Sequence, residues 1–381
     1  MIRTVNVFSP GDSRSITLWS NVPYMLCRAL ERCGYRVNRI DYHDNAFRRR
    51  KWLKPLVRLC DVIRLLGINF SVYTWFYYRS ADRKIREADR KFPADLQITT
   101  SFDMCNRFSA KPNVVIGDWT QEYLYRRRLH RRVKGHDRVR ILRQKQAIER
   151  SDYVVSLFPQ CAEDMRVHYD NPRIFHLGCN AVNSVYDGVF DPEAVCRDKA
   201  SSRKILFVGR KRYLRAARLL VESFADLLLS QPDAELHIVG LSASDLKVPP
   251  PAAASVHFYG YLNKADAAQC AQYYRLMLEA RVFANPTPLW GGYSSTIEAM
   301  YFCNPVLISP YEDFTAEFGA DNPFTYYCPE FTRQGLAGVL EGIFSEPAEA
   351  YAARCRAARA AVAEYTWENW VRRLIALVEK G

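Results

Sequence analysis

The sequence predicts an α/β fold made of two Rossmann-like domains. At 381 residues, the chain is longer than a single hydrophobic core usually supports. Short runs rich in Val, Ile and Phe alternate with segments of helical periodicity, which is typical of parallel sheets covered by helices. This βαβ pattern begins twice, near residue 5 and again near residue 204, so each half of the chain predicts a sheet of its own.

The composition fits a globular protein without a membrane-spanning segment. Hydrophobic residues make up 49% of the chain and charged residues 25%. No uncharged apolar run is long enough to cross a bilayer, and a strand-like segment follows Met1 almost directly, so we expect neither a signal peptide nor a transmembrane helix. The eleven cysteines form no C-x-x-C pair, which favours reduced thiols and a cytoplasmic location. H-E-x-x-H and D-x-D are absent, so we expect no metal site and no bound cofactor.

The net charge of +13 bears on partners rather than on fold. Positive residues gather at 48–51 and 126–145, and charge alone leaves nucleic acid, anionic membranes and phosphorylated substrates open. Aromatic residues do not alternate with the second run, so specific nucleic-acid binding is not favoured. Residues 47–78 combine an apolar side with basic residues. They predict either peripheral contact with the inner face of an anionic membrane, or a helix packed on its own domain.

The first half, residues 1–184, predicts a doubly wound domain. A strand at residues 5–8 precedes a glycine loop containing Gly11, but G-x-G-x-x-G is absent, so a dinucleotide site is not supported. Asp118 lies at the carboxyl end of a strand expected at 113–119, where ligands of open sheets bind; a turn or N-cap aspartate is the alternative. A basic helix is expected over residues 126–150, and the polar segment 184–203 predicts a linker.

The stretch 283–308 carries the strongest functional signal. An apolar strand is followed by Gly291 and Gly292, and a helix then begins with Tyr293, Ser294 and Ser295. Glycines let backbone N–H groups approach an anion, and the unpaired N–H groups of the first helical turn favour a phosphate there. An ordinary N-cap in a buried αβ unit is the alternative.

The second half, residues 204–364, adds two cations and a carboxylate to this stretch. Arg210 follows an apolar strand directly, and Arg215 lies five residues further on. Glu298 lies one turn into the helix, where it could accept hydrogen bonds from ribose hydroxyls. Because the carboxyl ends of parallel strands share one edge, these groups could converge. Together they predict a nucleoside-diphosphate site in which cations, without a metal, stabilise a leaving diphosphate.

These residues resemble the family 4 glycosyltransferases, retaining enzymes with the GT-B architecture of two Rossmann-like domains facing across a cleft. The matching segments of the C-terminal half are ILFVGR with its second cation, VHFYGYL, STIEAMYFCNPVLI and the terminal TWENW helix. The N-terminal half matches more loosely, through its glycine loop and ERSDYVVSLF…LGCNAVN. The resemblance implies that residues 365–381 form a helix that crosses back to the N-terminal domain.

The resemblance also implies a role for each matching position. Arg210 and Arg215 would hold the donor diphosphate, with Gly11 beneath it from the other domain. The remaining donor-site contacts would come from the start of the helix, at Gly291, Gly292, Tyr293, Ser294 and Ser295.

The other matching positions concern the ribose, the base and the acceptor. Glu298 would bind the ribose, while Tyr261 and Leu262 would border the base. Asp118 falls near the catalytic or acceptor-orienting position. Trp290 replaces the first glutamate of the family's E-x7-E motif, which normally contacts the donor sugar, so the sugar is left open.

We therefore expect a glycosyltransferase that moves a sugar from a nucleotide diphosphate sugar, its donor substrate, to a hydroxyl acceptor. The resemblance implies retention of configuration and no metal. The basic segment 47–78 suggests a glycan or lipid-linked acceptor, as in lipopolysaccharide, capsule or lipid-linked oligosaccharide assembly. The alternatives are a nucleotide-sugar 2-epimerase on the same fold, or a non-enzymatic protein that binds nucleic acid or an anionic surface.

Overall fold

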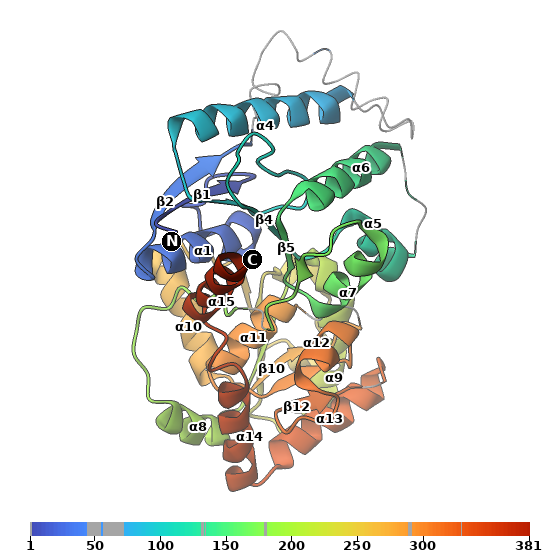
Figure 1. Cartoon of the computed structure of the whole chain (residues 1–381). Coiled ribbons are helices and arrows are strands. Elements are labelled where there is room, and N and C mark those ends of the chain that lie inside the picture. Colours follow the sequence, from blue (N-terminus) through green and yellow to red (C-terminus); the bar gives the residue numbers. More distant parts are fainter. Residues whose placement is uncertain are drawn as a thin grey trace. The chain divides into compact units, whose positions relative to one another are not determined.

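The computed structural model describes residues 2–43, 55, 72–130, 133, 135–178, 181–288, 292–328 and 330–381. The chain divides into two compact units (Figure 1): Met1–Ala181 with Trp367–Gly381, and Val182–Thr366. Each unit contains a six-stranded sheet whose paired strands are all parallel. The predicted α/β class with two Rossmann-like sheets is therefore confirmed.

The sheet of the first unit has the strand order β2-β1-β3-β4-β5-β6. Its strands are β1 Thr4–Ser9, β2 Arg36–Asp41, β3 Leu96–Thr99, β4 Asn113–Gly117, β5 Tyr153–Ser156 and β6 Ile174–Phe175. The helices described in this unit are α1 Val22–Arg32, α4 Val72–Lys91, α5 Gln121–Tyr123, α6 Gly135–Arg150, α7 Pro159–His168 and α15 Trp367–Lys380. The strand order reverses between β1 and β3, which is where open sheets of this kind bind ligands.

The sheet of the second unit has the order β12-β11-β10-β7-β8-β9. Its strands are β7 Lys204–Val208, β8 Glu235–Val239, β9 Val256–Gly260, β10 Val282–Asn285, β11 Val306–Ile308 and β12 Thr325–Tyr327. Its helices are α8 Pro192–Ser201, α9 Leu214–Leu227, α10 Ala267–Glu279, α11 Tyr293–Tyr301, α12 Glu312–Phe318, α13 Arg333–Ser345 and α14 Ala348–Ala361. Here the order reverses between β7 and β10.

The central strands are apolar without alternation because helices cover both faces of each sheet. In β7, Ile205, Leu206 and Phe207 are all buried. Helix α9 has the opposite pattern, with one buried stripe that packs into the same core as Ile205 and Phe207. Helical spacing brings that stripe to one face.

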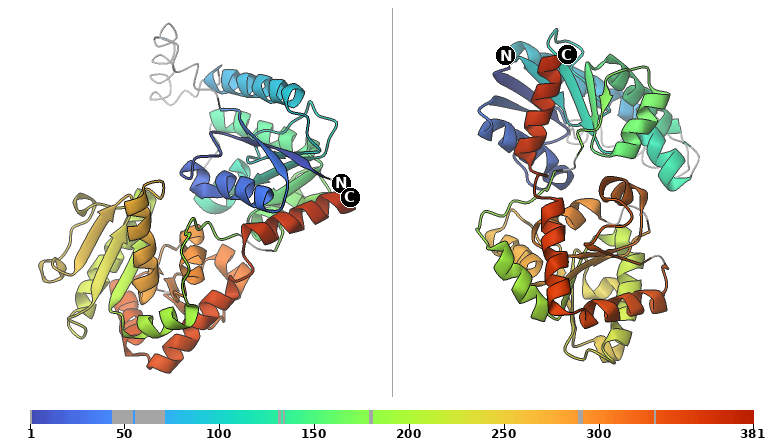
Figure 2. Two further views of the ribbon diagram at one scale, coloured as in Figure 1. Left: turned by 90° about the vertical axis from the view of Figure 1, so that its left-hand side faces the viewer. Right: turned by 60° about the horizontal axis from the view of Figure 1, so that its bottom comes forward.

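The C-terminal helix α15 packs on the first unit. Its buried residues recur at helical spacing and are Trp367, Trp370, Val371, Leu374, Ile375 and Val378. Arg373 donates from Nη1 to the Leu177 carbonyl at 2.9 Å, and Glu368 forms an ion pair with Arg32 on α1 at 2.9 Å. The Ile2 amide also donates to Glu379 Oε1 at 3.3 Å, so the first described residues lie beside the end of α15, as Figure 2 shows.

The predicted linker at 184–203 is wrong for its second half, which forms α8 of the second unit. Although its sequence is polar, this helix contains a buried lysine. The ammonium of Lys199 donates to the carbonyls of Met277 and Ala280 at 2.7 and 2.9 Å. The same group donates to Asn304 Oδ1 at 2.7 Å. Three acceptors satisfy a lysine that hydropathy alone assigns to solvent.

The continuous basic helix predicted over 126–150 is also wrong. A short π-helical segment, Leu124–Leu129, ends at His130 in the left-handed region with φ 45°, and α6 begins at Gly135. Several cations of the run pair with carboxylates of their own unit, among them Arg126 with Asp164 at 2.6 Å and Arg140 with Asp103 at 3.0 Å. These pairs account for part of the charge that suggested an anionic partner.

The basic segment 47–78 lies mostly outside the described residues, so membrane contact through it stays a prediction. Within the ranges that the structure describes, no helix is both long enough and apolar enough to span a bilayer.

Candidate functional site

The reversal of strand order in the second sheet brings the carboxyl ends of β7 and β10 together, and open α/β sheets bind ligands outside such ends. The two strands are direct neighbours, with Phe283 paired to Leu206. Asn285 ties their ends: its side-chain amide donates to the Val208 carbonyl at 3.3 Å. Asn285 is fully buried, so it fixes where the two following loops begin.

Gly292 stands at the start of α11 on this edge. Its φ of 70° lies in the left-handed region, which glycine adopts without the strain that a side chain adds. A Cβ atom here would lie 2.9 Å from Asn285 Nδ2 and 3.0 Å from Ser295 Oγ. The Ser295 amide, which the sequence predicts as a hydrogen-bond donor to a phosphate, donates to the Gly292 carbonyl at 2.8 Å. This donor is therefore already used within the helical turn.

The other residues predicted at the start of the helix differ in their surroundings. Gly291 and Trp290 lie outside the described residues. The ring of Tyr293 is buried edge-on against Phe314, so its side chain belongs to the core rather than to a ligand site. The Ser294 hydroxyl accepts from Asn183 Nδ2 at 3.1 Å.

Arg210 and Arg215 follow β7, and both are exposed. The guanidinium carbon of Arg210 lies 4.5 Å from the ring centre of Tyr261, and that of Arg215 lies 4.9 Å from the ring centre of Phe331. Stacking on a ring orients a guanidinium and leaves its N–H groups directed outward, where an anion can accept them. Leu262, predicted beside the base, is half-buried next to Tyr261.

Glu298 is buried one turn into α11, and protein donors surround its carboxylate. Lys264 donates from Nζ to both oxygens, at 2.7 and 2.9 Å. Tyr273 donates to Oε2 at 2.9 Å, and Tyr274 donates to Oε1 at 3.1 Å. Burial, followed by the neighbouring Glu298 charge, raises the pKa of both tyrosines, so the hydroxyls stay protonated donors. Ribose binding by Glu298 stays a prediction, and the ribose would have to share or replace these donors.

Asp118 belongs to the first unit, directly after β4. Its Oδ1 accepts from the Trp119 amide at 2.8 Å, and its Oδ2 accepts from the Trp19 indole at 3.4 Å. Burial raises the pKa of this carboxyl above that of an ordinary aspartate. The geometry agrees with a positioned carboxylate at a sheet edge, and it agrees equally with the turn aspartate of the alternative reading.

Gly11 lies in the loop after β1, at the point where the first sheet reverses its order. Its φ of 144° suits glycine, and a Cβ atom would lie 3.0 Å from Leu18 Cδ1. Nearby, Trp19, Ser20 and Asn21 have φ values of 41°, 50° and 70°, all in the left-handed region. Three consecutive non-glycine residues in this region are costly, and such strain gathers at ligand sites.

Four residues of this site carried no recognisable sequence signal. Asn285 reads as the end of an apolar strand, yet it joins β10 to β7. Lys264, Tyr273 and Tyr274 come from a loop and from α10, and only the fold brings them to Glu298. Two adjacent tyrosines in a helix that is otherwise partly polar were the single available hint.

Comparison with known proteins adds a family match to this geometry. The family model described as "Glycosyl transferases group 1" matches residues 202–340. The matched span runs from just before β7 into α13, so it contains Arg210, Arg215, Gly292 and Glu298. No curated protein sequence matches at a significant level.

Several solved structures share this fold. Sucrose-phosphate synthase from Thermosynechococcus elongatus aligns with a TM-score of 0.65 and 14% identity, over 99% of this chain and 98% of its own. A protein assigned as a UDP-N-acetylglucosamine 2-epimerase from Listeria monocytogenes aligns with a TM-score of 0.61 and 13% identity, over 100% and 98%. WaaG, a glycosyltransferase involved in lipopolysaccharide biosynthesis, aligns with a TM-score of 0.53 and 17% identity, over 79% and 82%.

At these identities the likeness establishes the fold alone, and that fold serves both transferases and an epimerase. The family match concerns the half that contains the two arginines and the glycine-capped helix. The family model for glycosyl transferases group 1 thus matches residues 202–340, and this match, in a chain with the GT-B fold, supports a glycosyltransferase.

Proposed function

We propose that the second unit binds the diphosphate of a nucleotide sugar at the carboxyl ends of β7 and β10, and that the chain transfers the sugar to a hydroxyl acceptor with retention of configuration. We assign it on the same basis to the family 4 type of retaining, metal-independent transferase. The donor is a substrate, and no further cofactor is required.

The observation that carries this proposal is the pairing of two anion-binding elements at one strand reversal. Arg210 follows β7, while Gly292 opens α11 after β10, and the Asn285 bond to Val208 holds the two strand ends together. A helix N-terminus and a guanidinium both favour a phosphate, and guanidinium groups bind two of its oxygens at once. Arg215, at the start of α9, supplies a second positive charge.

The reaction breaks the bond between the anomeric carbon of the sugar and a diphosphate oxygen. The acceptor oxygen attacks from the same face, and its proton passes to the departing diphosphate oxygen, so that the configuration is retained. Arg210 and Arg215 stabilise the negative charge that develops on the diphosphate. Asp118 orients the acceptor hydroxyl, and Glu298 contributes to ribose binding, with Tyr261 and Leu262 beside the base.

A thermal-shift screen of UDP, GDP, ADP and CMP, free and sugar-linked, tests the donor site, because a ligand of the native state raises the melting temperature. One nucleoside diphosphate is expected to raise it in the wild type, and Arg210→Ala is expected to reduce that shift strongly. Arg218→Ala, an exposed arginine further along α9, is the matched control and keeps the shift. If the ligand raised the melting temperature of Arg210→Ala as much as that of the wild type, Arg210 would not belong to the donor site.

Turnover distinguishes the transferase from a nucleotide-sugar 2-epimerase, which the likeness to an epimerase structure keeps as the alternative. A transferase consumes the sugar nucleotide only when an acceptor is present and forms a glycoside whose anomeric configuration, read by NMR, matches the donor. Undiminished turnover in excess EDTA supports metal independence. Conversion of the nucleotide sugar to an isomer without any acceptor would favour the epimerase.

The acceptor is proposed to be a glycan or a lipid-linked glycan at a membrane, with the protein in the cytoplasm and peripherally attached through residues 47–78. This part of the proposal rests on the basic and apolar composition of that segment. In liposome flotation, binding should rise with the anionic lipid content and fall with salt. Equal flotation with neutral and anionic vesicles would remove the membrane role without affecting the donor site.

A further inference from the structure

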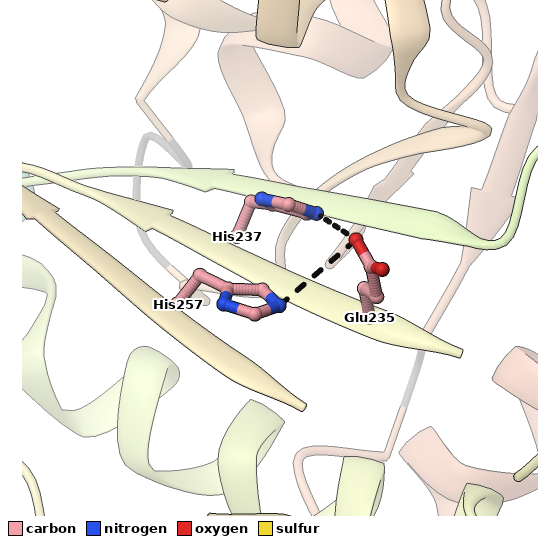
Figure 3. A group of neighbouring side chains, drawn as sticks. All are labelled: Glu235, His237 and His257. Carbon is pink, nitrogen blue, oxygen red and sulfur yellow. Dashed lines mark hydrogen bonds and ion pairs between the residues drawn. The ribbon is translucent and has the colours of Figure 1, made fainter. Parts of the chain in front are cut away.

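Three potential metal ligands share one face at the outer edge of the second sheet. His237 on β8 and His257 on β9 are directly paired across the two strands. Glu235 precedes His237 by two residues, so strand alternation directs its side chain to the same face. Figure 3 shows both imidazole rings turned toward this carboxylate. Strand β9 is the edge strand of the sheet.

The distances between these groups are close to those of a metal site. Glu235 Oε2 lies 2.9 Å from His237 Nε2 and 3.9 Å from His257 Nε2. One ligand atom from each residue lies within 4.8 Å of the other two. A tetrahedral zinc ion with bonds of about 2.1 Å separates its ligand atoms by about 3.4 Å. The required adjustment is small, and the half-exposed ring of His257 is free to make it.

The outer contacts also fit a metal ligand. A histidine that binds a metal through one ring nitrogen usually hydrogen-bonds through the other. Here His237 Nδ1 lies 2.8 Å from the Tyr259 hydroxyl, on the same strand face as His257. On binding, the single proton of the neutral ring moves from Nε2 to Nδ1, so that Nε2 can bind the ion and Nδ1–H donates to the Tyr259 oxygen.

The lysine on the strand next to Glu235 forms its ion pair elsewhere. Lys204 on β7 is the cross-strand partner of Glu235, yet its ammonium pairs with Glu279 on α10 at 2.7 Å. Among the described residues, the side-chain partners of the Glu235 carboxylate are therefore the two histidines. Figure 3 draws both interactions as dashed lines.

We propose that Glu235, His237 and His257 bind one divalent transition-metal ion of the zinc class, with water at the remaining position. Two imidazoles and one carboxylate suit zinc, and the Irving–Williams order makes copper and nickel suitable probes. Glu235 is the first residue of β8, whereas Arg210, Gly260 and Tyr261 lie at the carboxyl ends of their strands. The ion would therefore tie the edge strand to its neighbour rather than take part in donor chemistry.

Zinc binding to the metal-free full-length protein tests the proposal. Competition with a chromophoric chelator should give one site per chain, and zinc should raise the melting temperature. Glu235→Gln and His257→Gln each remove one ligand at a partly exposed position and should weaken binding at least tenfold, with melting temperatures in EDTA close to that of the wild type. His130→Gln, an exposed histidine of the other unit, should bind zinc as the wild type does.

Buried thiols are the competing explanation, since Cys196, Cys303 and Cys355 pack together in the same unit. Cys196→Ser should keep the zinc affinity. Wild-type affinity in Glu235→Gln or His257→Gln, loss of the site in Cys196→Ser, or no zinc binding at micromolar concentration would each overturn the proposal. Donor binding measured in EDTA is unaffected in either case, so the proposed function is tested separately.

Discussion

The Glu298 carboxylate is buried with one ammonium and two phenolic hydroxyls around it, and this set determines its chemistry. Lys264 contacts both oxygens, and its ammonium also lies 4.2 Å from the ring centre of Tyr273. Removal of one member of a buried ion pair leaves an uncompensated charge, which costs more than the intact pair contributes. Any role of Glu298 toward a donor is therefore combined with a structural one.

A double-mutant cycle separates these contributions. Glu298→Ala and Lys264→Met should each lower the free energy of unfolding by about 3 kcal/mol, because each leaves the partner's charge buried alone. The double variant should lose clearly less than the sum of the two. Urea unfolding measures all three, and Lys247→Met, at an exposed lysine of the same unit, is the control with little effect. Additive losses would mean that the two side chains do not interact.

Asp118 gives a pH prediction. Burial raises its pKa, so its carboxylate is protonated as the pH falls through a value above the ordinary aspartate value of about 3.9. If the carboxylate orients the acceptor, transfer activity should fall on the acid side at that raised pKa, and Asp118→Asn should be slow with that acid limb missing. Asp170→Asn, at an exposed aspartate of the same unit, should keep the wild-type profile. A variant at position 118 that retains the same acid limb would exclude this carboxyl as its origin.

At the scale of single residues, residue type and local spacing predicted Arg210, Gly292 and Glu298 as candidates for the donor site. Cations after a strand and glycine before a helix are local patterns that the sequence shows directly. Partners were not predictable. Lys264 reaches Glu298 from a separate loop, and the ligand set on β8 and β9 combines residues from two strands that no short motif covers. Distances between such residues depend on the packing of the elements, which spacing along the chain does not encode.

At the scale of elements, the loop from β10 into α11 depends on the conformation of one glycine. Gly292 combines a left-handed φ with neighbours that leave no room for a side chain, because a Cβ atom would meet Asn285. Gly34, after α1, also has a left-handed φ of 90° but has nothing within 4 Å of such an atom. The two positions separate the cost of the backbone conformation from that of the close contact.

Alanine substitutions at both glycines make this comparison. Gly34→Ala should lower the free energy of unfolding by about 1 kcal/mol, since only the left-handed backbone opposes it. Gly292→Ala should lower it further and should also weaken nucleoside-diphosphate binding, because the start of α11 must shift. Equilibrium unfolding and a thermal-shift titration measure the two effects. Equal losses at both positions, with donor binding intact, would show that the close approach to Asn285 is unimportant.

Apolar periodicity predicted most strands and helices, because a buried face imposes its spacing on the sequence. Two elements were mispredicted for identifiable reasons. The polar composition of α8 predicts an exposed linker. Lys199 is instead buried, and its ammonium donates to carbonyl groups rather than to solvent. The basic run predicts one helix over 126–150, whereas His130 adopts a left-handed conformation that ends the first segment and that sequence periodicity does not reveal.

At the scale of the whole molecule, α15 is the last element of the chain but belongs to the first unit. Trp370 is fully buried there, and the helix adds a large apolar face to that unit. Trp370→Ala should lower the stability of the first unit by about 4 kcal/mol, through lost burial and the cavity that remains. Lys380→Ala, exposed on the same helix, should have little effect.

The two units allow this prediction to be read separately from donor binding. Proteins with two units need not unfold in one step, so in Trp370→Ala the first unit should unfold at a lower temperature or denaturant concentration than it does in the wild type. Nucleoside-diphosphate affinity at low temperature should stay within about twofold of the wild type. A variant as stable as the wild type would mean that α15 contributes no core to the first unit.

The central claim is that Arg210 and the start of α11 recognise a diphosphate at the reversal between β7 and β10. The most direct measurement is calorimetric titration of wild type, Arg210→Ala and Arg218→Ala with matched pairs of nucleotides: UDP and UMP, GDP and GMP, ADP and AMP. For one pair, the wild type and Arg218→Ala should prefer the diphosphate by at least about tenfold, or about 1.4 kcal/mol, and Arg210→Ala should lose most of this preference while its monophosphate affinity is unchanged. A preference for the diphosphate that is the same in Arg210→Ala as in the wild type would contradict the account.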